Sequence, residues 1–250
     1  MFFLTHQFFF NMKIALFGYG KMGQLIAELA GQQGHEIVAT ISLEKPLSEW
    51  KEALISAEVA IEFSVPAMAL NHIRACMELR LPVVVGTTGW YEHIETLKRE
   101  CETQGAAVLY ASNFSVGVHL FWKLVSEAAA LMQKYPAYTV SLHEIHHTAK
   151  LDAPSGTAIT TAEKVMKHYH QIKNWTLGEG GEGQLNIKAD RVGEVPGTHE
   201  LIFSSEHDII RLEHEALNRK GFAEGALQAA AWLRNRTGFY SIDDWMQSTF

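Results

Sequence analysis

Short apolar runs alternate with helical patterns through the first half of the chain. Five runs rich in Val, Ile, Leu, Ala and Phe are typical of strands that are buried on both faces of a parallel sheet. They lie at residues 13–17, 36–41, 59–63, 83–85 and 107–110. Helical periodicity predicts helices between them at residues 22–33, 67–79 and 91–103. Strands that alternate with helices predict an α/β fold with a doubly wound parallel sheet.

The pattern changes after Asn113. It predicts a long helix at about residues 116–134, a strand with alternating polarity at 138–145, a loop, and a helix from Thr157. A glycine-rich flexible break at 178–183 precedes further elements: strands at 185–189, 200–203 and 208–215, a helix at 222–234 and a turn at 242–246. We therefore expect two domains, one from residues 1–114 with 219–250, and a smaller α+β domain from residues 115–218.

Composition narrows the functional classes. With 47% hydrophobic and 20% charged residues the chain is ordinary for a globular protein. A net charge of −7 provides no basic surface for nucleic acid, so small molecules are the expected partners. The two cysteines, Cys76 and Cys101, stand far apart and outside any CxxC pair, which indicates neither a disulfide scaffold nor a thiolate metal site. We expect a cytoplasmic protein.

The first eleven residues, MFFLTHQFFFN, are apolar but do not resemble a signal peptide. Thr5, His6 and Gln7 interrupt the run, and the first lysine is Lys13. The stretch is also far shorter than the roughly 20 apolar residues that cross a bilayer, so no membrane association is expected. Because MKIALFGYG leads directly into a strand, our hypothesis is that the natural chain starts at Met12.

A glycine-rich turn, GYGKMG, follows the first predicted strand and precedes a helix. This context is the one that the dinucleotide fingerprint GxGxxG requires, although a purely structural turn is the alternative. The glycines let the backbone approach a pyrophosphate, whose charge interacts with free N–H groups at the helix N-terminus. The predicted cofactor-binding residues of the turn are Gly18, Tyr19, Gly20, Lys21, Met22 and Gly23.

The end of the second strand bears on the choice of cofactor. Glu44 lies about 20 residues beyond the glycines, where an acid binds the adenosine ribose, but it comes slightly late after the strand. Ser42, with Lys45 nearby, would also tolerate a 2′-phosphate. We therefore expect the use of both NADH and NADPH.

Two further turns follow the fourth and fifth strands, GTTG and SNFS. The carboxyl edge of an open parallel sheet binds ligands, so these turns are expected to surround the nicotinamide ring. Ordinary turn chemistry is the alternative. The residues in question are Gly86, Thr87, Thr88, Ser112, Asn113 and Phe114.

The sequence HEIHH, from His143 to His147, matches the HExxH pattern of zinc metalloproteases. That motif requires a helix, where residues four apart share a face. Here His143 lies in an alternating strand pattern, YTVSLHEI, which would put the two histidines about 13 Å apart, too far for one zinc ion. We expect no metal site.

An acid/base site at the strand end fits the segment better. Two adjacent histidines supply a proton donor near neutral pH, which hydride addition to a C=C or C=N bond needs. A lysine follows, and PSGT opens a helix whose free N–H groups form an anion cradle that suits a carboxylate. The candidate residues are His146, His147, Lys150, the N-cap Ser155, Gly156 and Thr157.

These segments closely resemble the 4-hydroxy-tetrahydrodipicolinate reductase family, also called dihydrodipicolinate reductase. HHTAKLDAPSGTA is its hallmark, and GYGKMG, VVVGTTGW, SNFSVGV, RVGEVPGTHE and FAEGALQAAAWL lie in the family's order. The resemblance implies a Rossmann domain built from both chain ends and a substrate-binding and oligomerisation domain that forms a homotetramer through its sheets. It also implies NAD(P)H-dependent reduction of a small dicarboxylate, 4-hydroxy-tetrahydrodipicolinate, to tetrahydrodipicolinate in diaminopimelate and lysine biosynthesis.

The resemblance further implies a role for each residue of the hallmark. His146 would donate the proton, Lys150 would bind and polarise the substrate and share the acid role, and His147 would bind a carboxylate. Gly156 and Thr157 would hold the other carboxylate through their backbone N–H groups. The chain departs from the family in two places: the family often has an acidic residue at the end of the second strand, and the stretch after VPGT is shorter here.

Two rival functions remain. Another small Rossmann reductase, such as an amino-acid dehydrogenase, would need only the glycine-rich turn, and the DAPSGTA segment argues against it. A regulatory protein that senses NAD(H) without turnover would need no proton donor and should show a face for DNA or a protein partner, which the acidic composition does not indicate. The site, rather than the fold, separates these functions.

Overall fold

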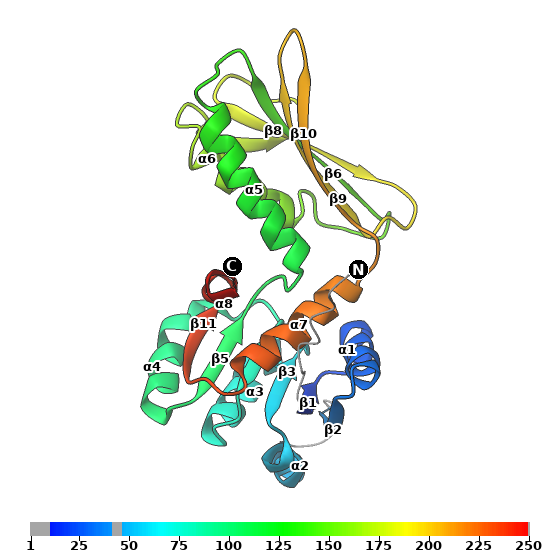
Figure 1. Cartoon of the computed structure of the whole chain (residues 1–250), viewed down its shortest axis with the longest axis vertical. Helices are drawn as coiled ribbons and strands as arrows, with labels where there is room; N and C mark the ends of the chain where they lie inside the picture. The colour runs from blue at the N-terminus through cyan, green and yellow to red at the C-terminus, as the bar shows by residue number, and fades with distance from the viewer. Residues whose placement is uncertain (1–10, 42–46, 250) are drawn as a thin grey trace, which may run out of the picture. The chain divides into compact units, whose positions relative to one another are not determined.

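The structure is a computed structural model that describes residues 11–41 and 47–249 (Figure 1). The chain divides into two compact units, one of residues 1–115 with 222–250 and one of residues 116–221. Among the described residues, no helix is long and apolar enough to cross a membrane.

A six-stranded parallel sheet organises the first unit (Figure 1). Its strand order is β11-β5-β4-β3-β1-β2, and every neighbouring pair is parallel. The strands are β1 (Lys13–Phe17), β2 (Glu36–Ile41), β3 (Val59–Glu62), β4 (Val83–Val85), β5 (Ala107–Tyr110) and β11 (Gly238–Ser241). From β1 the chain first adds β2 on one side and then β3 on the other. The topological switch point, where such sheets bind ligands, therefore lies between β1 and β3.

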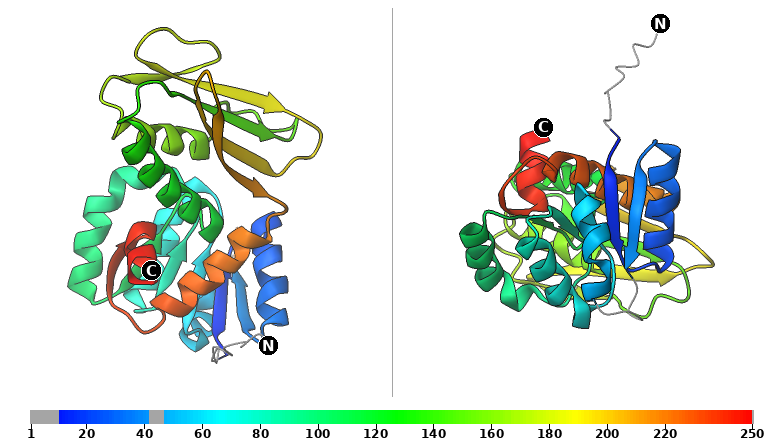
Figure 2. Two further views of the ribbon diagram at one scale, coloured as in Figure 1. Left: turned by 45° about the horizontal axis from the view of Figure 1, so that its top comes forward. Right: turned by 90° about the horizontal axis from the view of Figure 1, so that it is seen from below.

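Helices cover both faces of this sheet (Figure 2). One face packs against α2 (Lys51–Ser56), α3 (Pro66–Glu78) and α4 (Ile94–Gln104). On the other face lie α1 (Lys21–Gln32) and α7 (Lys220–Leu233). Because both faces are covered, β4 is a run of three valines that are all fully buried. The short elements η1 (Leu47–Trp50), η2 (Tyr91–His93) and α8 (Ile242–Thr249) complete the unit.

The C-terminal helix α7 makes a close contact with the loop after β5. A Cβ atom on Gly225 would lie 1.8 Å from the carbonyl oxygen of Phe114, so only glycine fits. Glycine costs about 1 kcal/mol relative to alanine inside a helix, and here it allows backbone to approach backbone. Strand β11 then pairs with β5, so the last residues of the chain complete the sheet that the first residues begin.

The second unit contains a mixed five-stranded sheet with helices on one face. Its strand order is β10-β9-β6-β8-β7, with β6, β8 and β7 parallel and β9 and β10 antiparallel to their neighbours. The strands are β6 (Thr139–His146), β7 (Asn174–Leu177), β8 (Gln184–Arg191), β9 (Gly197–Ser204) and β10 (Ile209–Ala216). The core of the unit lies between this sheet and the helices α5 (Val116–Met132) and α6 (Gly156–Met166).

Alternation along β6 decides which of its side chains reach the helix-covered face. Leu142, Glu144 and His146 are buried, whereas the residues between them are partly exposed. The period of two therefore places a carboxylate and an imidazole in positions that apolar side chains would normally occupy.

The predicted fold class is confirmed, with differences in detail. Sequence patterns did not predict the short elements α2, β7 and β11, because four to six residues are too few to establish a period. The predicted turn at 242–246 is a helix, and α1 begins at Lys21, one residue earlier than expected. The units divide after Ser115 and Gly221, where the sequence had placed boundaries after residues 114 and 218.

Candidate active site

A pocket of about 400 Å³ lies at the carboxyl ends of β1, β3 and β4 in the first unit. It brings together six of the predicted cofactor residues, Gly20, Lys21, Met22, Gly86, Thr87 and Thr88. Phe63, Ser64 and Pro66 complete its lining, and sequence analysis did not single them out. Their position after a buried strand was the available signal. This pocket is at the switch point, where a doubly wound sheet binds dinucleotides.

Each of the three glycines of the fingerprint is required, or suited to its position, for a different structural reason. Gly18 has φ +89°, and a Cβ there would lie 2.3 Å from the carbonyl oxygen of Phe63. A Cβ on Gly23 would lie 2.2 Å from the carbonyl oxygen of Gly18, so this glycine lets α1 pack against the turn. Around Gly20 no atom lies within 4 Å of a Cβ position. Gly20 is therefore the one whose open side faces the pocket and allows a ligand to approach the backbone.

The start of α1 fits a pyrophosphate. Gly20 is the N-cap and provides no side-chain hydrogen bond, and the first turn contains no acidic residue. The first-turn N–H groups have no carbonyl partner within their own helix, and the helix dipole adds positive potential at this end. Together with the pocket beside Gly20, these features fit the phosphates of a dinucleotide.

Other predicted cofactor residues are placed differently. Ser42 and Glu44 lie outside the described residues. Ser112, Asn113 and Phe114 are not among the residues that line the pocket. Phe114 is buried and packs its ring 5.9 Å from that of Phe63, so it supports the pocket wall from behind. Tyr19 is half exposed, and its carbonyl accepts a hydrogen bond from the side chain of Gln24.

A buried carboxylate, Glu62, organises the loops behind this pocket. Its Oε1 accepts hydrogen bonds from the backbone N–H of Ser64, at 3.1 Å, and from the Ser64 hydroxyl, and it lies 3.3 Å from Nδ1 of His72 on α3. The Ser64 N–H also donates to the hydroxyl of Thr87 at 2.9 Å. Glu62 thus ties the loop after β3, and through it the loop after β4, to α3. The charged residue at the end of an apolar strand was the only sequence signal for it.

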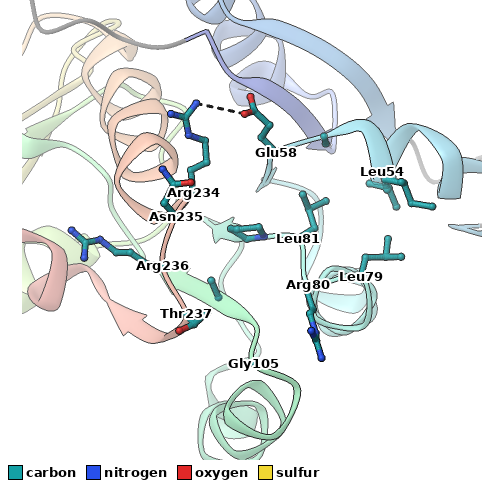
Figure 3. Close-up of a pocket in the computed structure, with 14 residues that line it drawn as sticks. Leu54, Glu58, Leu79, Arg80, Leu81, Gly105, Arg234, Asn235, Arg236 and Thr237 are labelled. Atoms are coloured by element: carbon teal, nitrogen blue, oxygen red, sulfur yellow. Dashed lines mark ion pairs between the residues drawn. The ribbon is translucent and has the colours of Figure 1, made fainter.

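A second pocket of the first unit, of about 420 Å³, lies at the opposite edge of the sheet (Figure 3). Its lining comes from the amino ends of β3, β4, β5 and β11, and an ion pair of 3.8 Å joins Arg234 to Glu58 across it. Its slightly larger volume does not make it the cofactor site. Helix N-termini and glycine-rich turns lie at the carboxyl edge, and that edge binds nucleotides in this architecture.

In the second unit, Glu144 is the centre of a polar cluster, and its side chain is fully buried. The backbone N–H of Ser155 donates to both carboxylate oxygens, at 3.1 and 3.2 Å, and both terminal nitrogens of Arg191 lie 3.3 Å from Oε1. Sequence patterns alone do not single out Glu144 or Arg191. Two features of the sequence could have indicated them: Glu144 lies at a position of β6 whose side chain is expected to be buried, and Arg191 is the last residue of β8.

The helix start that the sequence predicts as an anion cradle is the beginning of α6. Ser155 is the N-cap, and its hydroxyl accepts a hydrogen bond from the N–H of Ala158 at 3.2 Å. Gly156 is exposed and Thr157 half-buried, and first-turn N–H groups have no carbonyl partner in their own helix. The cap therefore uses the N–H of Ala158, and the N–H groups of Gly156 and Thr157 lie in the first turn beside it.

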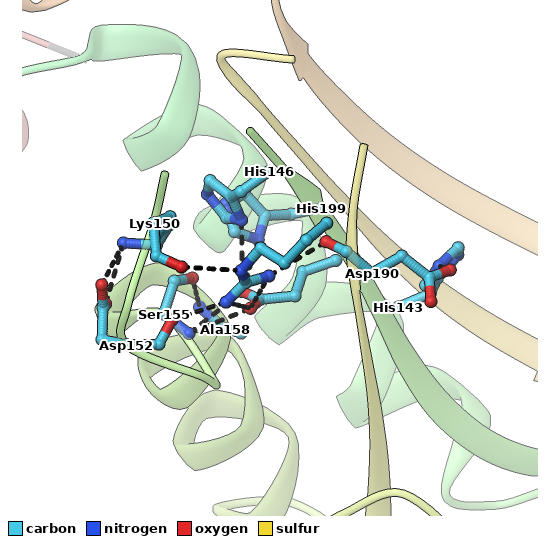
Figure 4. Close-up of polar contacts among 10 residues, drawn as sticks. His143, His146, Lys150, Asp152, Ser155, Ala158, Asp190 and His199 are labelled. Carbon is cyan, nitrogen blue, oxygen red and sulfur yellow. Dashed lines mark hydrogen bonds and ion pairs between the residues drawn. The ribbon is translucent and has the colours of Figure 1, made fainter. Parts of the chain in front are cut away.

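Lys150 and His147 lie in the loop before this helix. The Lys150 amine contacts both carboxylate oxygens of Asp152 at 2.8 Å, rather than standing free beside the cradle (Figure 4). The carbonyl of His147 accepts from the N–H of Lys150 at 3.1 Å, and its side chain is half-buried. Asp152 is exposed, so this ion pair contributes little to stability.

His146 lies beside the Glu144 carboxylate and next to a second histidine, His199. Nδ1 of His146 lies 3.7 Å from Oε2 of Glu144, and Nδ1 of His199 lies 4.0 Å from the same oxygen. The two rings meet edge to face at 5.1 Å. Burial lowers the pKa of His199 to about 3, so this ring is neutral. Burial also lowers the pKa of His146, although the Glu144 carboxylate opposes that shift.

The cluster also bears on the metal question. His143 lies on β6, as predicted, and points to the other face of the sheet, where its Nε2 bonds Asp190 at 2.8 Å (Figure 4). The ligand atoms of Glu144, His146 and His199 do lie within 4.8 Å of one another. However, a dication there would compete with the guanidinium of Arg191 for the same carboxylate in a buried space. We interpret the cluster as one that handles protons.

Comparison with known proteins identifies the family. Residues 12–114 match the family described as the N-terminus of dihydrodipicolinate reductase, and residues 117–246 match the one described as its C-terminus. The chain belongs to the dihydrodipicolinate reductase family. Membership of this family makes the chain an oxidoreductase that uses a pyridine nucleotide.

Relatives in the dihydrodipicolinate reductase family match nearly the whole chain. The 4-hydroxy-tetrahydrodipicolinate reductase of Christiangramia forsetii is 41% identical over 239 residues, which is 96% of this chain and 99% of the relative. The enzyme of the same name from Staphylococcus carnosus is 36% identical and covers 93% of this chain and 99% of its own.

Solved structures agree with this assignment. The dipicolinate-bound dihydrodipicolinate reductase from Paenisporosarcina sp. TG-14 superimposes with a TM-score of 0.76 at 25% identity, covering 94% of this chain and 99% of its own. An engineered D-amino acid dehydrogenase bound to NADP+ reaches a TM-score of 0.52 at 11% identity, which shows a shared fold alone. The rival dehydrogenase function therefore has only the fold in its favour.

Proposed function

We propose that this protein reduces 4-hydroxy-tetrahydrodipicolinate to tetrahydrodipicolinate in diaminopimelate and lysine biosynthesis. The observation that carries the proposal is the Glu144 cluster next to the start of α6. It occurs in a chain that relatives named 4-hydroxy-tetrahydrodipicolinate reductase match over nearly its whole length. Replacement of the 4-hydroxyl by hydrogen consumes one hydride and one proton and releases water. A bound nicotinamide supplies the hydride.

The residues of the second unit bind the dicarboxylate and supply the proton. The N–H groups of Gly156 and Thr157 hold one carboxylate, and His147 binds the other. Lys150 exchanges Asp152 for the substrate, binds and polarises it, and shares the acid role. His146 donates the proton from its imidazolium form, which the neighbouring Glu144 carboxylate favours against the effect of burial on its pKa.

The turn at Gly18–Gly23 and the loop at Gly86–Thr88 hold the nucleotide. We propose that NADH and NADPH both serve as hydride donors, as expected from Ser42 and Glu44. Steady-state kinetics with each nucleotide test this point, and a preference of roughly a thousandfold for either one, about 4 kcal/mol, would contradict it.

A coupled assay tests the function. Aspartate semialdehyde, pyruvate and the preceding synthase generate the substrate, and the loss of reduced nucleotide is followed by absorbance. We expect turnover that depends on both the synthase and this protein. No oxidation above background would overturn the proposed function. An amino-acid dehydrogenase would instead reduce NAD⁺ when offered amino acids, which we expect not to occur.

We also propose that the enzyme is a cytoplasmic homotetramer that assembles through the sheet of the second unit. Strand β10 exposes Ile209 and Ile210, about half and two-fifths accessible, which is unfavourable in a free chain. The two cysteines are unpaired, as in reducing compartments. Light scattering should give four times the 28.0 kDa chain mass, and a monomer would refute the tetramer.

A further inference from the structure

The fully buried carboxylate of Glu144 lies between Arg191, His146 and the start of α6. One oxygen faces the guanidinium of Arg191, the other faces the imidazole of His146, and both accept from the N–H of Ser155. We propose that Glu144 and Arg191 form a positioning pair that orients His146 and holds the Lys150 loop and the start of α6 together. The proposal rests on the proposed function.

Arg191 extends the pair into the loop. Its Nε donates to the carbonyl of Lys150 at 3.2 Å, and one Nη donates to the carbonyl of Asp152 at 2.5 Å. The planar guanidinium thus joins two backbone carbonyls of the loop to the Glu144 carboxylate. A lysine could not make these contacts, because its ammonium is a single point of charge without a fork of donors. The pair therefore fixes the backbone from which the Lys150 amine extends.

The geometry around His146 gives the pair its second role. Nδ1 of His146 is buried and has no hydrogen-bond partner among the described residues, and Oε2 of Glu144 is 3.7 Å away. On the other edge of the ring, a Cβ atom on Gly197 would lie 3.0 Å from Nε2. A carboxylate beside Nδ1 favours the tautomer that carries its proton there. The ionised ring then holds its second proton on Nε2, the nitrogen that we assign to proton donation.

The charges around His146 predict a kinetic signature. Burial lowers the pKa of His146, the carboxylates of Glu144 and Asp152 raise it, and Lys150 and Arg191 lower it; the adjacent His199 is neutral. Loss of the Glu144 charge therefore lowers the pKa of His146 further. Because a general acid must be protonated, activity falls as the pH rises through this pKa. The alkaline limb of the pH profile should then move to lower pH in a Glu144→Gln variant.

The experiment compares Glu144→Gln with a matched control in the full-length enzyme. Glu100→Gln also removes a carboxylate that pairs with an arginine, Arg74 at 3.0 Å, but in the first unit on α4. In Glu144→Gln we expect kcat to fall about tenfold or more, the alkaline limb to move to lower pH and KM for NADH to stay unchanged. Glu100→Gln should keep wild-type values.

Binding of dipicolinate, a stable dicarboxylate, provides a readout that does not require turnover. Glu144→Gln should weaken dipicolinate binding in calorimetry about tenfold or more, because the start of α6 loses its anchor. Should Glu144→Gln fail to fold, Arg191→Lys keeps the positive charge and removes the fork, and the same weakening is expected. Wild-type kinetics, pH profile and dipicolinate affinity in whichever variant folds would overturn the positioning pair. An inactive wild-type enzyme would instead overturn the proposed function.

Discussion

Among the described residues, each unit has one buried carboxylate close to the end of a strand, and the two carboxylates have different partners. Glu62 faces a histidine and a serine and orders the loops of the cofactor pocket. Glu144 faces an arginine and a helix N-terminus and orders the proposed substrate site. Arginine keeps its charge at all physiological pH values, whereas histidine does not. The difference teaches that the proposed substrate site is built around an ion pair with arginine, and the proposed cofactor pocket around a network of hydrogen bonds.

The largest expected effect concerns the stability of the two networks. Arg191→Ala leaves the Glu144 carboxylate buried without its countercharge, which should lower the free energy of unfolding by about 3–5 kcal/mol. His72→Ala removes one hydrogen-bond partner of Glu62 and should cost about 1–3 kcal/mol. Urea denaturation followed by circular dichroism measures both. Equal losses in the two variants would break the distinction between ion pair and hydrogen-bond network.

The next effect concerns chemistry. His146→Ala and Lys150→Ala should each lower kcat by at least about a hundredfold, as the loss of general acid catalysis does. KM for NADH should remain within a few-fold of wild type, since both residues belong to the second unit. Steady-state kinetics in the coupled assay give both parameters. Wild-type turnover in both variants would refute the assigned roles.

A smaller effect is expected for Glu62, the buried carboxylate of the first unit. Glu62→Gln keeps the shape of the side chain but weakens its hydrogen bonds to Ser64 and its contact with His72. Since Ser64 lines the cofactor pocket, KM for NADH should rise several-fold, about 1 kcal/mol, with kcat close to wild type. A large fall in kcat with KM unchanged would show that Glu62 also acts in the chemistry.

The smallest effect tests the cap of the cradle. Ser155→Ala removes the hydroxyl that accepts from the N–H of Ala158, which should lower the free energy of unfolding by about 1 kcal/mol. The backbone N–H of Ser155 still donates to Glu144, so dipicolinate affinity should fall less than in Glu144→Gln. Calorimetry measures the dipicolinate affinity of both variants. A larger loss of affinity in Ser155→Ala than in Glu144→Gln would show that the Ser155 hydroxyl matters more for binding than the Glu144 carboxylate.

Sequence patterns were sufficient for features that repeat or that keep a fixed spacing. Buried strands with helices between them gave the parallel sheet, and GYGKMG at a strand end gave the position of the pocket around Gly20. The N-cap role of Ser155 followed from its place before a helical pattern. Each of these depends on neighbours in the chain, so local chemistry decides it.

The features that were missed depend on contacts between distant residues. Arg191 reaches Glu144 from 47 positions away, because β8 and β6 are adjacent in a sheet whose order no local pattern encodes. His72 reaches Glu62 by the packing of α3 on the sheet.

Gly225 and β11 determine when the first unit can be completed during synthesis. The close contact of α7 with Phe114 and the pairing of β11 with β5 both require residues that are synthesised after the whole second unit. Before β11 is synthesised, β5 pairs with β4 alone and is an edge strand with apolar side chains, Val108 and Leu109 among them, and such edges favour aggregation. The nascent chain therefore passes through a stage at which a chaperone would find an exposed strand to protect.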